Sequence, residues 1–192
     1  LGLVPDLTAK AARTAASNAG AKVVKTFAYE ISGSEQQEIY DINPDLVLLC
    51  GGTDGGNKEV IIANAKHLVA IDRPFTTIVA GNKSANDDIK AIFDEAGKDV
   101  VITANVMPQF NKLNIEPARD AIRQLFISRI IEAKGLNILQ SMTSYKIIPT
   151  PLAVLHACEL LSKGTKTQQG RGDLLAVDIG GATTDVYSMA SG

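Results

Sequence analysis

The hydrophobic residues in the first half of the chain fall in short continuous runs rather than in strict alternation. The runs at residues 45–52, 76–82 and 99–105 are apolar on both faces of an extended strand, and segments of helical pattern separate them at 57–69 and 85–97. Strands that are apolar on both faces and are separated by helices of about 12 residues indicate a mostly parallel sheet with helices on both faces. We therefore expect a doubly wound, Rossmann-like α/β unit over roughly the first 105 residues.

The chain before these runs predicts a helix, a strand and a second helix. Residues 6–19 are rich in alanine and predict a helix, and residues 21–31 are β-branched and aromatic, which is typical of a strand. Ser34 and Gln37 have the spacing of a capping box, and the helix that they open is expected to end before Asn43.

Further helices are expected at 85–97, 117–135 and 150–164. The first has Ser84 and Asp87 as candidate caps. In the second, the helical spacing places one apolar group toward a core, namely Ala121, Leu125, Ile127 and Ile131.

Composition excludes several classes of partner and of site. The chain has 192 residues, of which 45% are hydrophobic, and a formal net charge of −2 without a cluster of lysines or arginines. This balance argues against nucleic acid and against an anionic membrane as main partners. No run is long enough for a membrane helix and the first residues lack an export signal, so we expect a cytoplasmic protein. Cys50 and Cys158 lie outside any metal-binding spacing and suit small buried positions.

The glycine-rich stretch CGGTDGGNK at residues 50–58 has two interpretations. Glycines between a strand and a helix form either a structural turn or a cradle of backbone N–H groups for an anion or a partner. A P-loop is rejected, because Lys58 comes one residue late and Glu59 replaces the hydroxyl that would hold Mg²⁺. His67 and His156 have no ligand spacing, and packing or surface roles are expected for both.

Residues 174–188, LLAVDIGGATTDVYS, carry the most specific pattern. Two apolar strands flank a short connection that contains Gly180, Gly181, Ala182, Thr183 and Thr184. The glycines allow backbone amides to approach a polyphosphate, and the threonines add hydroxyl donors. Asp178, at the end of the first strand, is placed to hold water around Mg²⁺, and Asp185 closes the motif. An ordinary hairpin explains the glycines, but not two acids and two threonines around them.

The motif DIGGATTD resembles the second phosphate motif of the actin-like ATPase superfamily. Over nearly the whole chain, the segments GLVPDLTAKAARTAA, NPDLVLLCGGTDGGNKEVIIANAKHL, VAGNKSANDDI, NVMPQFNKLNIEPARDAIRQLF and DIGGATTDVYS resemble the MutL (GlmL) family, which is associated with adenosylcobalamin-dependent glutamate mutase. These proteins are unrelated to the DNA mismatch-repair proteins that share the name.

The resemblance implies a chaperone-like ATPase that uses ATP and Mg²⁺ to release damaged cobalamin from an adenosylcobalamin-dependent mutase. It implies a doubly wound domain over residues 1–135, and over 136–192 a connecting helix and the start of an actin-like, ribonuclease H-like lobe. The first phosphate motif is absent from the sequence, so we expect an internal fragment that does not hydrolyse ATP by itself. A hydantoinase-like, oxoprolinase-like or kinase-like enzyme, or a binding module without hydrolysis, remains an alternative.

Overall fold

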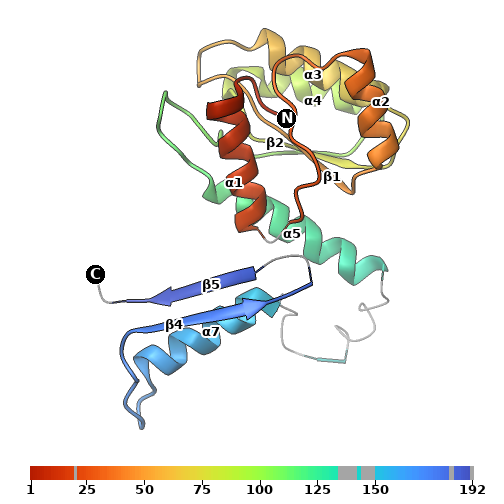
Figure 1. Cartoon of the computed structure of the whole chain (residues 1–192). Coiled ribbons are helices and arrows are strands. Elements are labelled where there is room, and N and C mark those ends of the chain that lie inside the picture. The colour runs from red at the N-terminus through yellow and green to blue at the C-terminus, as the bar shows by residue number, and fades with distance from the viewer. Residues whose placement is uncertain (20, 134–141, 144–149, 182–183, 191–192) are drawn as a thin grey trace. The chain divides into compact units, whose positions relative to one another are not determined.

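The structure is a computed structural model that describes residues 1–19, 21–133, 142–143, 150–181 and 184–190 (Figure 1). It divides into two compact units, Leu1–Arg123 and Gln124–Gly192. Helix α5, Glu116–Ala133, begins in the first unit and ends in the second.

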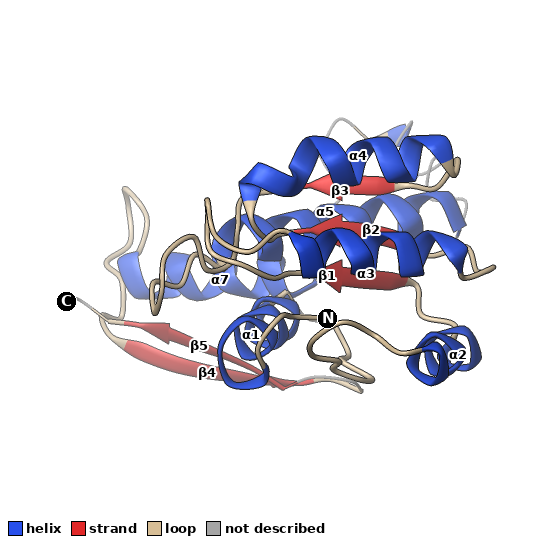
Figure 2. Ribbon diagram, turned by 90° about the horizontal axis from the view of Figure 1, so that it is seen from above, coloured by secondary structure: helices blue, strands red, loops and turns tan. Residues whose placement is uncertain are grey.

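The first unit is built on a parallel sheet in the order β1-β2-β3. Strands β1 (Leu46–Leu49), β2 (Thr76–Val79) and β3 (Val100–Ile102) coincide with the three predicted apolar runs. Helices α3 (Glu59–Ala70) and α4 (Asn86–Glu95) lie on one face of the sheet, and the first part of α5, up to Arg123, lies on the other (Figures 1 and 2). The predicted α/β class and parallel sheet are confirmed.

Two short segments extend this sheet beyond β1. Leu1 N donates to Leu48 O and Cys50 N donates to Leu1 O, which is the pattern of parallel strands. Gly2 in turn forms a parallel bridge with Ala28. The spatial order is therefore residues 27–29, residues 1–2, β1, β2 and β3. The π-helix η1 (Pro5–Ala9) and helix α1 (Lys10–Asn18) connect the first two segments, where one helix was predicted.

The strand predicted at 21–31 is wrong, since only Ala28 forms a bridge there. Tyr29 has φ +67°, a left-handed conformation that ends any extended run, and Val24 is 63% exposed. The β-branched and aromatic side chains of residues 21–31 are of a kind that packs well in a sheet, but only Phe27 and Ile31 among them are buried.

Two predicted helix starts are also wrong. Helix α2 (Gly33–Ile42) is opened by a capping box between Ser32 and Glu35, two residues before the predicted pair Ser34 and Gln37. The helix ends as expected, with Asn43 in the left-handed conformation.

Before α4, the predicted caps Ser84 and Asp87 are replaced by a short 3-10 helix, η2 (Lys83–Ala85). Its cap is the side chain of Asn82, which accepts from Ser84 N.

The core of this unit lies between the sheet and the helices on its faces. Its fully buried members include Leu49, Ile61, Leu68, Val79, Ile89 and Phe93. Among the described side chains of α5, Ala118 and Ile122 are buried, whereas the predicted core residues Ala121 and Leu125 are only partly buried. The side chains of Ile127 and Ile131 lie outside the described residues.

The second unit contains α7 (Thr150–Lys163) and an antiparallel hairpin of β4 (Leu174–Ile179) and β5 (Thr184–Met189). One face of the hairpin carries the buried Tyr187 and packs on α7. The other face is apolar and exposed, with Leu175, Val177, Ile179 and Val186 between 55% and 80% accessible. Among the described helices, none has the length and apolar character that a membrane span requires.

Candidate functional site

The predicted phosphate motif forms the closed end of the β4–β5 hairpin. Asp178 on β4 is paired with Asp185 on β5, and the next pair toward the tip is Ile179 with Thr184. Residues directly opposite each other in an antiparallel pair share a face, so the two carboxylates lie side by side at the mouth of the turn. Both aspartates are half-buried. The strand–turn–strand arrangement predicted for this segment is therefore present.

Thr184 belongs to the other face of the hairpin, together with the exposed Ile179. The structure thus brings Asp178 and Asp185 together and separates them from the Thr184 side chain. Ala182 and Thr183 lie outside the described residues.

The glycines of the tip leave space for a ligand. Gly180 and Gly181 are exposed, and a Cβ atom added at Gly181 would meet no atom within 4 Å. Gly181 also lacks the positive φ that would demand glycine, so neither strain nor packing in the described residues requires it. Close approach of a ligand to the backbone is a role that explains the residue.

The donor set at this tip fits Mg²⁺ better than a transition metal. Mg²⁺ keeps several waters and uses one or two carboxylates in addition to phosphate oxygens, and Asp178 and Asp185 supply two carboxylates. In the described part of the chain, no group of three His, Cys, Asp or Glu side chains gathers as an all-protein metal site would require. When bound, Mg²⁺ would neutralise phosphate charge, and Asp178 and Asp185 would orient its waters.

The glycine-rich stretch at 50–58 is a turn locked from inside by Asn82. The Asn82 side chain is fully buried; its Oδ1 accepts from Gly55 N at 3.1 Å, and its Nδ2 donates to Gly56 O at 2.9 Å and to Asn57 O at 3.1 Å. Gly52 has φ +71°, and a Cβ there would lie 2.1 Å from Asn57 O. The chain follows this tight path only with glycine at that position.

Asn105, which follows β3, fixes the same turn from the other side. Its Nδ2 donates to Gly52 O and to Asp54 Oδ1, both at 3.0 Å. The backbone N–H groups of Asp54, Gly55 and Gly56 already donate within the protein, as does that of Lys58 to its neighbour Glu59. These amides are not open to an anion, and the structure favours the interpretation of a structural turn. Neither asparagine was predicted to have this role, although each is the last residue of a predicted apolar run.

In the crevice where α/β proteins often bind ligands, Leu3 lies close to the glycine-rich turn. The order in which successive strands are added to the sheet reverses between residues 1–2 and β1. In α/β proteins, ligands bind outside the carboxyl ends of the strands at such a point. Here a Cβ at Gly51 would lie 3.3 Å from the Leu3 Cβ, so the side chain of Leu3 already occupies the space beside the turn.

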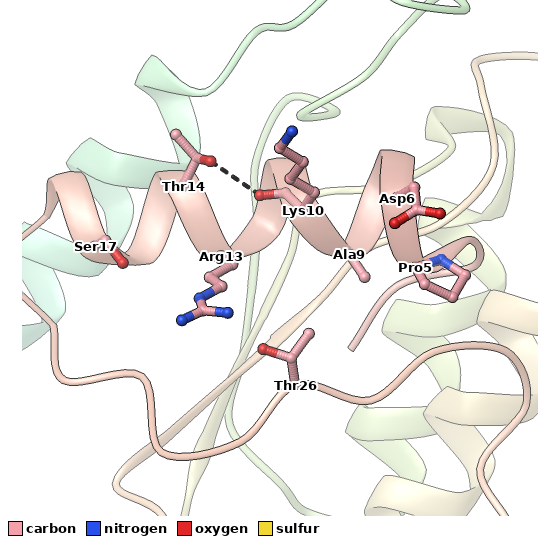
Figure 3. A pocket seen from close by; sticks show the side chains of 8 residues that line it. All are labelled: Pro5, Asp6, Ala9, Lys10, Arg13, Thr14, Ser17 and Thr26. Carbon is pink, nitrogen blue, oxygen red and sulfur yellow. Dashed lines mark hydrogen bonds between the residues drawn. The ribbon is translucent and has the colours of Figure 1, made fainter.

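A shallow surface depression lies along η1 and α1 (Figure 3). Its polar side chains include Asp6, Lys10, Arg13 and Thr26. Lys10 and Arg13 point to different sides of the helix, so the two cations do not converge on one ligand (Figure 3). The depression is a weaker candidate than the hairpin tip.

The histidines and cysteines have structural surroundings. His67 Nδ1 lies 3.3 Å from Gln36 Nε2, and its Nε2 lies 3.2 Å from Glu30 Oε1, so the ring links α3 to α2 and to the segment before it. His156 is exposed. Cys50 and Cys158 are buried free thiols, as predicted, and burial raises the pKa of Cys50 to about 12.

Comparison with known proteins identifies the family. The family described as "MutL protein" matches residues 1–192. The chain is 50% identical, over all of its 192 residues, to "Protein MutL" of Clostridium tetanomorphum, and it spans 42% of the length of that relative. No solved structure matches the chain. On the match over its whole length and on this identity, the chain belongs to the MutL protein family.

Proposed function

We propose that this chain is part of an actin-like ATPase that reactivates an adenosylcobalamin-dependent mutase of the glutamate mutase type, by releasing damaged cobalamin at the expense of ATP. The observation that carries the proposal is the pairing of Asp178 with Asp185 near the exposed Gly180 and Gly181. Two carboxylates beside free space for a polyphosphate suit Mg-ATP. Membership of the MutL family supports the same direction.

The exposed face of the hairpin supports a larger lobe around this site. Leu175, Val177 and Ile179 on β4 are all more than half exposed, and such contiguous apolar surface is uncommon on a soluble protein unless another element covers it. The strands of an actin-like lobe carry layers on both faces. The ATP site proposed here therefore belongs to the full-length protein, where a first phosphate loop would face the hairpin tip.

Within this site the chain contributes binding and orientation rather than a nucleophile. The backbone at Gly180 and Gly181 would donate to phosphate oxygens, and the carboxylates of Asp178 and Asp185 would hold waters in place. Phosphoryl transfer depends mainly on such positioning and charge stabilisation.

The test uses the full-length protein with its mutase. The mutase is first inactivated so that it holds damaged cobalamin, and recovery of activity is then followed with ATP, with a non-hydrolysable ATP analogue and without nucleotide. Recovery that requires free cobalamin and hydrolysable ATP supports the proposal. ATP-dependent conversion of a small-molecule substrate in the absence of any mutase would instead identify a metabolic enzyme. Binding of ATP without hydrolysis would identify a binding module.

A further inference from the structure

The segment after β3 presents an exposed aromatic side chain on a tight turn. Lys112 N donates to Gln109 O at 3.0 Å, and Asn111 has φ +58°, the left-handed conformation common in such turns. Phe110 lies between them and is 71% exposed, and the following Leu113 is 57% exposed. Two large apolar side chains are thus directed to solvent within four residues.

This turn is held firmly in place. Asn114 N donates to Val106 O at 2.8 Å, and Asn114 Nδ2 donates to Asn105 O at 3.2 Å, which closes the base of the turn. Asp54 N donates to Pro108 O at 3.0 Å and ties the turn to the glycine-rich stretch. Val106 and Met107 are buried beneath it. The exposure of Phe110 therefore belongs to a fixed conformation and costs little further ordering on binding.

The turn also lies at the carboxyl ends of the strands, where α/β proteins place their binding surfaces. All three strands are parallel, so the segments that follow β1, β2 and β3 emerge at one edge, and the loop after β3 projects from it (Figure 1). Lys112 lies next to Phe110 within the turn, and Lys83 is linked to the start of the turn through Asp54, whose Oδ1 accepts from Lys83 N and whose N–H donates to Pro108 O. Both are exposed, and among the described residues neither forms an ion pair.

We propose that this turn, residues 108–113, is the anchor by which the protein binds the mutase, with Phe110 entering an apolar pocket that carboxylates surround. Aromatic residues on preorganised surfaces contribute a large share of binding energy, and lysines around them accelerate association with an acidic partner. The identity of the partner rests on the proposed function. The apolar tip and the basic border define its chemistry independently.

The test measures binding of the purified mutase to full-length protein by calorimetry, in the native form and in three variants. Phe110→Ala should weaken binding at least tenfold, because truncation of a central aromatic anchor has an effect of this size. Lys112→Glu should weaken binding at low salt and reduce the dependence of the affinity on salt. Val24→Ala is the control, since Val24 is an apolar side chain of similar exposure, 63%, that lies outside the turn.

The outcomes separate the inference from the proposed function. Native protein that does not bind the mutase overturns both. Native protein that binds, with Phe110→Ala binding equally well or with Val24→Ala weakened to the same degree, overturns the anchor alone. A change in ATPase activity or melting temperature of Phe110→Ala without mutase would mean that the turn packs within its own chain, and would also overturn it.

Discussion

Replacing Asn82 with alanine removes the side chain that holds the glycine-rich turn against β2. The amide makes four hydrogen bonds, two accepted from Gly55 N and Ser84 N and two donated to Gly56 O and Asn57 O. A net value of about 1 kcal/mol for each bond gives a loss of about 4 kcal/mol, because the partners are left in a site that alanine cannot fill. Domains are stable by only about 5–15 kcal/mol, so Asn82→Ala should be among the most damaging polar substitutions in the chain.

Urea unfolding monitored by circular dichroism measures this loss. The midpoint should fall strongly with the slope unchanged, and the melting temperature should drop by roughly 10 °C. Lys83→Ala, the exposed neighbour, should change stability by less than about 0.5 kcal/mol. A loss below about 1 kcal/mol for Asn82→Ala would show that the turn keeps its shape without the asparagine, and the structural explanation of the turn would be wrong.

Three further predictions concern the same unit and the hairpin. Because burial raises the pKa of the Cys50 thiol to about 12, alkylation at pH 8 should reach Cys50 only after unfolding in urea; rapid labelling of native protein, read by peptide mass spectrometry, would contradict this. Hydrogen bonds from the Ser32 backbone N–H and hydroxyl lower the pKa of Glu35, so its stabilisation is present at neutral pH and is lost as pH falls through that lowered pKa. The free energies of unfolding of native protein and Glu35→Gln, measured in urea, should therefore differ at pH 7 by less than about 1 kcal/mol and converge in acid. Gly52→Ala should destabilise by more than about 2 kcal/mol, whereas Gly181→Val, with nothing within 4 Å of its Cβ, should leave the melting temperature nearly unchanged and weaken ATP binding in the full-length protein; equal melting temperatures for the two variants would contradict the geometry.

The sheet of the first unit could be predicted because no residue of its three strands is exposed. Continuous apolar runs such as Leu46–Leu49 leave few alternatives to a parallel strand. Residues 21–31 have equal β propensity, yet a strand also needs a partner, and the left-handed Tyr29 ends the one bridge that forms. Propensity describes a side chain, whereas pairing depends on the rest of the fold.

The hairpin tip was predictable, for a related reason. The hydrogen bonds of Asn82 and Asn105 to the glycine-rich turn were not. In DIGGATTD the acids, glycines and threonines are contiguous, so their spacing alone brings Asp178 opposite Asp185. Asn82 and Asn105 act on a turn that lies more than 24 residues earlier in the chain. Only the parallel order of the strands places them beside it, although an asparagine after each of two successive buried strands was a signal that could have been used.

The most direct test of the proposed ATP site is the steady-state ATPase rate of the full-length protein with Asp178→Ala. Loss of the carboxylate beside the glycine turn should lower turnover by about 10²- to 10³-fold with a smaller change in ATP affinity, as expected for a contact that acts mainly in the transition state. Thr184→Ala, which removes one neutral hydroxyl from the other face of the hairpin, should cost only several-fold. Normal ATPase activity and normal mutase reactivation by Asp178→Ala would contradict the proposal and leave DIGGATTD as the tip of an ordinary hairpin.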